Sequence, residues 1–198
     1  MHPDAVALID GTATVTYREL NVRANTLARR LGECGLRRGA VAVVRMNRSI
    51  DVATLLLAVL KAGAAYSWME PNSADGDGMS ASFCITQRKS CPEQRYLAVD
   101  LGNAFAMCAA RPSPNLPILT RGSDIACVLP DGDGTPGVLV PHETITSMPA
   151  PARSGIWTGE PGAFDLWISL MAGETLRIED QGSMIGDPGS LPAAPQAA

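Results

Sequence analysis

The chain has 198 residues, of which 46% are hydrophobic and 18% charged, and its formal net charge is -4. That length predicts one domain. A composition this apolar excludes disorder along the whole chain, and the negative net charge excludes a broad cationic surface for DNA or RNA. The longest apolar run, residues 52–65, is too short and too interrupted to span a bilayer. The five cysteines form no CxxC pair and no signal peptide is visible, so we expect a cytoplasmic protein with reduced thiols that binds neither nucleic acid nor membrane.

The first seventy residues alternate between strand and helix patterns. Thr16 and Glu19 have the spacing of a capping box, and Gly35 stands where the helix that starts there would have its C-cap. Ser49 is a candidate N-cap for a second, nearly all-apolar helix. The alternation predicts an α/β fold with mixed sheets flanked by helices and with parallel crossovers. The predicted elements are a hairpin over 5–16, helices over 16–34 and 50–62, and strands over 40–44 and 65–69.

The rest of the chain carries weaker patterns. Three prolines within residues 111–119 exclude regular structure there. From residue 181 onward Gly, Ser, Pro and Ala predominate, so we expect one domain over 1–180 and a disordered tail or linker over 181–198. The further predicted elements are strands over 82–86, 96–99, 125–129, 138–140 and 175–178, and a helix over 164–172.

Several segments resemble one family in sequence and in order. Residues 15–20, VTYREL, resemble the first core motif of the adenylation domains of nonribosomal peptide synthetases. Residues 60–71, LKAGAAYSWMEP, resemble their second motif, and the lead-in at 2–8 also matches. The resemblance identifies the chain as a truncated, N-terminal portion of this AMP-binding, adenylate-forming family. It implies an incomplete version of the family fold, with one surface helix missing near residues 72–82.

The family's phosphate loop has a diverged counterpart here. In the family, a Ser/Thr/Gly-rich loop that ends in Gly-x-Pro-Lys-Gly holds the ATP phosphates, because backbone amides, hydroxyls and a lysine surround the anion. Residues 124–129 resemble the strand before that loop and residues 135–142 resemble the segment after it. The loop between is short and lacks the lysine, since Pro136 passes directly to Gly137. The candidate nucleotide-binding residues are therefore those of a degenerate loop, namely Asp131, Gly132, Asp133, Gly134 and Thr135.

Two interpretations of the acidic loop remain open. Asp131 and Asp133 could hold a magnesium ion that bridges to phosphate. Alternatively, the loop is a solvated acidic turn between two strands, of the Asp-Gly hairpin kind. Two carboxylates at the place of a triphosphate would repel it, so we expect no bound cofactor, with ATP and magnesium relevant only to residual activity.

A last segment, residues 163–178, resembles the family's next core motif, in which a Phe-Asp pair opens a helix. The resemblance implies that Asp165 contacts the amino group of an amino-acid substrate. A carboxylate at a helix start is also an ordinary N-cap. Both interpretations of Asp165 are kept.

These features predict a degenerate, non-catalytic adenylation-like domain with no catalytic residue and no metal site. The family's later motifs, including the catalytic lysine of its C-terminal domain, do not appear in the sequence. Such a domain would serve as a spacer or docking surface for neighbouring condensation or carrier domains. The alternatives are one part of a split adenylation enzyme, completed by another chain, and a remnant that still binds an amino acid or adenosine.

Overall fold

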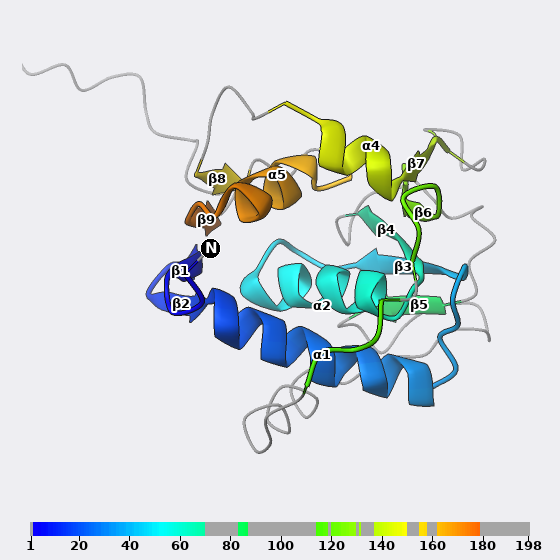
Figure 1. The fold of residues 1–198 in the computed structure, drawn as a ribbon, viewed down its shortest axis with the longest axis horizontal. Coiled ribbons are helices and arrows are strands. Elements are labelled where there is room, and N and C mark those ends of the chain that lie inside the picture. The colour runs from blue at the N-terminus through cyan, green and yellow to red at the C-terminus, as the bar shows by residue number, and fades with distance from the viewer. Residues whose placement is uncertain are drawn as a thin grey trace, which may run out of the picture.

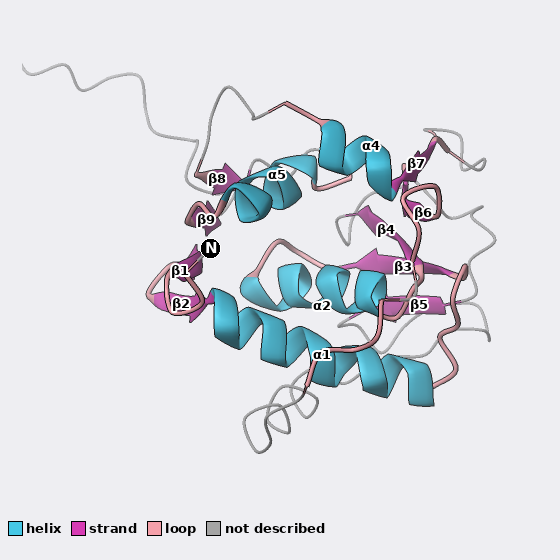
Figure 2. Cartoon of the chain, in the orientation of Figure 1, coloured by secondary structure: helices cyan, strands magenta, loops and turns pink. Residues whose placement is uncertain are grey.

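The computed structural model describes residues 2–69, 83–86, 114–118, 120–129, 131, 137–149, 155–157 and 162–178. Its strands form two sheets, with the helices packed against them (Figures 1 and 2). The predicted strand over 96–99 and the predicted tail over 181–198 lie outside the described residues. No helix in the described ranges is long and apolar enough to cross a membrane.

The first sheet has the strand order β2-β1-β9-β8. β1 and β2 form the predicted antiparallel hairpin, and β9 pairs parallel to both β1 and β8. The C-terminal part of the described chain thus returns beside its N-terminal hairpin. The strands are β1 (Val6–Asp10), β2 (Ala13–Thr16), β8 (Ile156–Trp157) and β9 (Leu176–Ile178).

The second sheet has the order β5-β3-β4-β6-β7. Its first four strands are parallel, as the alternation predicted, and β7 pairs antiparallel to β6. Every residue of β4 is buried, so apart from the buried Ser67 its side chains are apolar or aromatic on both faces and do not alternate with polar ones. The strands are β3 (Val41–Arg45), β4 (Ala65–Met69), β5 (Phe83–Thr86), β6 (Ile125–Val128) and β7 (Leu139–Pro141).

Local sequence signals place the two long helices. The capping box of α1 is present: Thr16 Oγ1 accepts from the Glu19 amide, and the Glu19 carboxylate accepts from the Thr16 amide at 2.8 Å. Ser49 caps α2 as predicted. The C-cap of α1 is Cys34, and Gly35 follows it with φ +100°. The helices are α1 (Tyr17–Glu33), α2 (Ile50–Lys61), α4 (His142–Ser147) and α5 (Phe164–Ala172).

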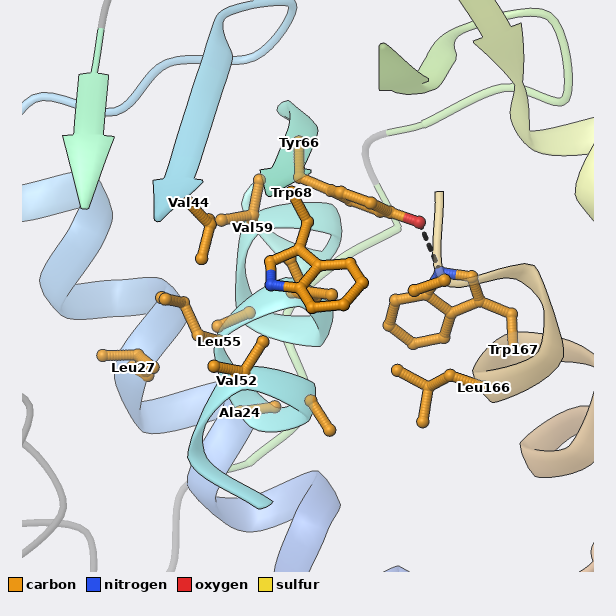
Figure 3. Packing of buried hydrophobic residues seen from close by; sticks show 14 of the residues in the cluster. Ala24, Leu27, Val44, Val52, Leu55, Val59, Tyr66, Trp68, Leu166 and Trp167 are labelled. Atoms are coloured by element: carbon orange, nitrogen blue, oxygen red, sulfur yellow. Dashed lines mark hydrogen bonds between the residues drawn. The ribbon is translucent and has the colours of Figure 1, made fainter. Parts of the chain in front are cut away.

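One core joins both sheets. α1 and α2 run side by side from the first sheet to the second, and α5 lies on the side of α2 that faces away from α1 (Figure 1). Figure 3 shows how side chains from α1, α2, the second sheet and α5 meet in this cluster. The two short elements α4 and β8 were not predicted from the sequence, because each is too short to show a periodic pattern.

Candidate functional site

β6, the strand before the diverged phosphate loop, ends at the carboxyl edge of the parallel strands. β6 runs parallel to β4, with Cys127 opposite Tyr66, so the chain leaves β6 at the edge where β3 and β4 also end. The Leu129 amide donates to the Val138 carbonyl at 2.9 Å and extends the pairing of β6 with β7. Residues 130–137 therefore form the connection. In open α/β sheets this edge is where ligands bind.

The charge of the loop is fixed by its residues. Residues 130–137 contain two aspartates and neither lysine nor arginine. The structure places Asp131 at the start of the connection, exposed to solvent. Gly132, Asp133, Gly134 and Thr135 lie outside the described residues, so the magnesium interpretation stays a prediction. Within the described part of the chain, no three potential metal ligands of the His, Cys, Asp or Glu type cluster.

Asp165, the predicted substrate contact, is the second residue of α5 and is 8% exposed. Its Oδ1 accepts from the Leu166 amide at 2.9 Å. The interpretation of Asp165 as an ordinary N-cap is wrong, because the N-cap is Ala163, which has φ 52° and ψ 38° and no capping side chain. The left-handed entry places the N-cap two residues ahead of the carboxylate. Asp165 still lies in the first turn, where the helix dipole favours a negative charge.

A buried tyrosine connects this helix start to the sheet. Trp167 Nε1 donates to the Tyr66 hydroxyl at 2.6 Å (Figure 3). That hydroxyl in turn donates to the Gly162 carbonyl. Gly162 also lies against Leu129, which immediately precedes the loop and is here called its base. A Cβ added at Gly162 would be 2.9 Å from Leu129 Cδ2. The base of the loop and the start of α5 thus meet around Tyr66. No sequence pattern indicated this role, since Tyr66 stood only as one apolar position of a motif.

The Tyr66 hydroxyl and the neighbouring Cys127 thiol keep their protons at neutral pH. Burial raises the pKa of Tyr66 well above its usual value, and the neighbouring Cys127 and Asp165 raise it further. Burial also raises the pKa of the Cys127 thiol to about 12. A thiol with such a pKa is a poor nucleophile, and a protonated phenol is no base. Tyr66 and Cys127 therefore hold the site together and supply no acid–base chemistry.

Comparisons with known proteins agree with this geometry. The family described as "AMP-binding enzyme" matches residues 1–78. Among solved structures, the N-terminal subdomain of Klebsiella oxytoca NpsA, in complex with 3-hydroxybenzoyl-AMSN, superposes with a TM-score of 0.74 at 26% identity, over 89% of this chain and 50% of that one. The chain belongs to the AMP-binding family. More closely, it is a partial, N-terminal portion of an adenylation domain of the nonribosomal peptide synthetase type.

The related AMP-binding proteins are mostly large synthetases. Malpibaldin synthetase of Mortierella alpina is 50% identical over 90% of this chain, and bacitracin synthase 1 of Bacillus licheniformis is 27% identical over 92%. This chain spans 4% of the length of each. An artificially fused adenylation–PCP di-domain, NpsA-ThdA from Klebsiella oxytoca, superposes with a TM-score of 0.75 at 26% identity, over 89% of this chain and 37% of that one. The family and fold predicted from the sequence motifs are confirmed.

Proposed function

We propose that this adenylation-like domain does not itself form an acyl-adenylate and acts as a spacer or docking domain for its neighbours. The neighbours are other domains of a nonribosomal peptide synthetase, of the carrier or condensation type. The solved relative described as an adenylation–PCP di-domain supports a neighbour of the carrier kind. Neither ATP nor magnesium is a cofactor in this proposal.

One observation carries the loss of chemistry, the acidic sequence of the loop that follows β6, a strand that ends at the carboxyl edge of the parallel strands. An anionic phosphate chain needs amide, hydroxyl and cationic donors at this edge. Residues 130–137 offer one hydroxyl, on Thr135, and two carboxylates. At contact distance each like-charge pair costs about 1 kcal/mol in water and more where water is excluded. The loss of one clamping donor adds about 3 kcal/mol to a transition state of this kind, and both effects disfavour catalysis.

The direct test is amino-acid-dependent ATP–pyrophosphate exchange with the purified chain. We expect no exchange above background with any proteinogenic amino acid, while an active adenylation enzyme assayed in parallel gives a signal. Exchange at rates normal for enzymes would overturn the proposal. Calorimetric titration with ATP, AMP and amino acids tests the binding-remnant alternative, for which heat of binding is required.

A loop variant tests the physical cause. Replacing both loop carboxylates, Asp131→Asn with Asp133→Asn, removes two negative charges and is expected to raise ATP affinity about fivefold or more. Glu33→Gln is the matched control, because Glu33 is exposed on α1, where it pairs with Arg30. Equal ATP affinity in the loop variant and the control would show that charge in this loop is not what excludes the nucleotide.

A split adenylation enzyme remains the second candidate. It is favoured by the position of Asp165, buried at the start of α5 near Tyr66, in a fold that matches half of a solved N-terminal subdomain. In that case a second chain carrying the rest of the domain would restore exchange on mixing. Exchange that returns with the partner, and is lost again in Asp165→Asn, would favour this candidate over the first.

A further inference from the structure

A groove lies between α5 on one side and α1 and α2 on the other. Two adjoining cavities of about 400 Å³ and about 550 Å³ form it. They share Asn21, Leu57, Lys61 and Asn115, so they are parts of one continuous depression, here called the α1–α5 groove. Of the predicted site residues that the structure describes, Asp131 and Asp165, neither lines it.

Hydrogen bonds hold the walls of the α1–α5 groove in place. The Tyr17 hydroxyl donates to the Glu174 carbonyl at 2.7 Å and ties α1 to the end of α5. Asn21 Nδ2 and Asn25 Nδ2 donate to Asn115 Oδ1 at 2.9 and 3.0 Å, and hold the segment 114–118 against α1. The groove is therefore formed before anything occupies it, which lowers the entropic cost of binding.

The floor and lips of the groove are apolar. Leu57 of α2 and Leu170 of α5 line it, and its lips carry Ile118, which is 93% exposed, and Met171, which is 45% exposed. Within the described ranges only two other large apolar side chains are as exposed, and both lie in or beside β7. An apolar strip of this kind, rimmed by polar groups, is typical of a protein interaction surface.

The charged side chains that line the groove are all basic. Among the described residues, its lining includes Arg18 and Lys61 and no aspartate or glutamate, although the whole chain carries a net charge of -4. Arg18 is already paired with Asp4. Lys61 Nζ donates to Asn21 Oδ1 at 2.8 Å, and no ion pair links it to a carboxylate in the described part of the chain. Burial and the nearby Arg29 lower the pKa of Lys61, so the cation is destabilised until an anion lies beside it.

We propose that the α1–α5 groove binds an acidic amphipathic helix of a neighbouring domain. Its apolar stripe would pack on Leu57, Leu170 and Met171, and a carboxylate beside the stripe would pair with Lys61. At the α5 end the groove runs between helices, with α1 and α2 on one side and α5 on the other, and an amphipathic helix with apolar residues at i, i+3 and i+4 is a common occupant of such a groove. This inference rests on the docking role proposed above and gives that role a location.

The test is calorimetric titration with a synthetic helical peptide of roughly 18 residues, about five turns. The acidic peptide has a leucine stripe flanked by glutamates, and its control has lysine in place of each glutamate. We expect the acidic peptide to bind at micromolar concentration, at least about tenfold more tightly than the basic one. Lys61→Glu reverses this order, and Met171→Glu weakens the acidic peptide without affecting the fold, because Met171 is exposed. Arg37→Glu is the matched charge control, since Arg37 is exposed and outside the groove.

The outcomes separate this inference from the proposed function. Absence of peptide binding at millimolar concentration, or equal binding of the two peptides, overturns the groove proposal and leaves the exchange result untouched. A purified carrier or condensation domain is titrated in the same way. If it binds and Lys61→Glu changes nothing, docking stands and the groove is the wrong surface. If light scattering shows a dimer that dissociates in Met171→Glu, the occupant is a second copy of this chain and the proposal is wrong.

Discussion

Tyr66 satisfies two buried polar groups with one hydroxyl. It accepts from the Trp167 indole and donates to the Gly162 carbonyl, and its side chain has no exposed surface. Tyr17 offers a natural comparison, because its hydroxyl also donates to backbone carbonyls but is only partly buried. Water can therefore take over the hydrogen bonds of the Tyr17 hydroxyl, but it cannot reach the groups that the Tyr66 hydroxyl satisfies.

Tyr66→Phe is therefore expected to lower the free energy of unfolding by about 2–3 kcal/mol, since it leaves an N–H and a carbonyl buried and unpaired. Tyr17→Phe should cost about 1 kcal/mol or less, the value of an ordinary exposed hydrogen bond. Urea unfolding of both variants measures the difference. Equal losses in the two variants would contradict the role assigned to Tyr66.

The thiols differ in reactivity for the same reason of burial. Cys34 is exposed, whereas Cys84 and Cys127 are buried. With its pKa raised to about 12, Cys127 at pH 8 is ionised in about one molecule in ten thousand. We expect iodoacetamide to modify Cys34 in the folded protein and Cys127 only after unfolding, as read by peptide mass spectrometry.

The pKa of Cys127 also has a consequence for stability. It is higher in the folded than in the unfolded chain, so the folded state keeps the proton longer. The contribution to stability is present below the unfolded pKa, about 8.5, and is lost as pH rises toward 12. Rapid labelling of Cys127 in the native protein at pH 8 would show that the thiol is not held in the core as described.

At the scale of elements, the entry into α5 shows how a distant contact sets a local conformation. Gly162 has φ +88° and Ala163 has φ +52°, so two left-handed residues precede the helix. A Cβ at Gly162 would lie 2.5 Å from Phe164 Cζ and 2.9 Å from Leu129 Cδ2. Gly11 has φ +57° with no atom within 4 Å of its built Cβ. Both glycines have a positive φ that would strain any residue with a side chain, but only Gly162 also lacks room for a Cβ.

Gly11→Ala is expected to cost about 1 kcal/mol, from the left-handed backbone alone. Gly162→Ala should cost about 1–3 kcal/mol more, because Phe164 or Leu129 must move in a packed core. Urea unfolding of both variants measures this, and circular dichroism checks that the helices persist. Similar losses would show that the space around Gly162 adjusts freely.

The same elements show what the sequence could and could not reveal. Thr16 and Glu19 predicted the start of α1, because a capping box is complete within four residues. The range of α5 was also predicted, but its left-handed entry was not, because Ala163 carries no capping side chain and the Gly162 carbonyl before it is held by Tyr66, about a hundred residues earlier in the chain. The loop after β6 was located through its resemblance to a phosphate loop. The α1–α5 groove has no sequence signature, since its lining comes from separate segments of the chain.

At the scale of the whole molecule, the two sheets share one core. Leu8 of β1 and Ile85 of β5 lie in different sheets, yet both have no exposed surface and both belong to the same buried cluster. α1 and α2 contribute to that cluster from between the sheets. Loss of packing at one sheet should therefore destabilise the other sheet as well, as expected for one cooperative unit.

We expect one unfolding transition in urea, with far-UV circular dichroism and tryptophan fluorescence giving coincident curves. Leu8→Ala and Ile85→Ala should each lower the free energy of unfolding by about 2–5 kcal/mol and shift both probes equally. Thr14→Ala, at an exposed position of β2, is the matched control and should change the midpoint little. Separate transitions, or a variant that moves one probe alone, would mean that the sheets unfold independently. In that case a partner bound in the α1–α5 groove would stabilise only the part of the chain it contacts.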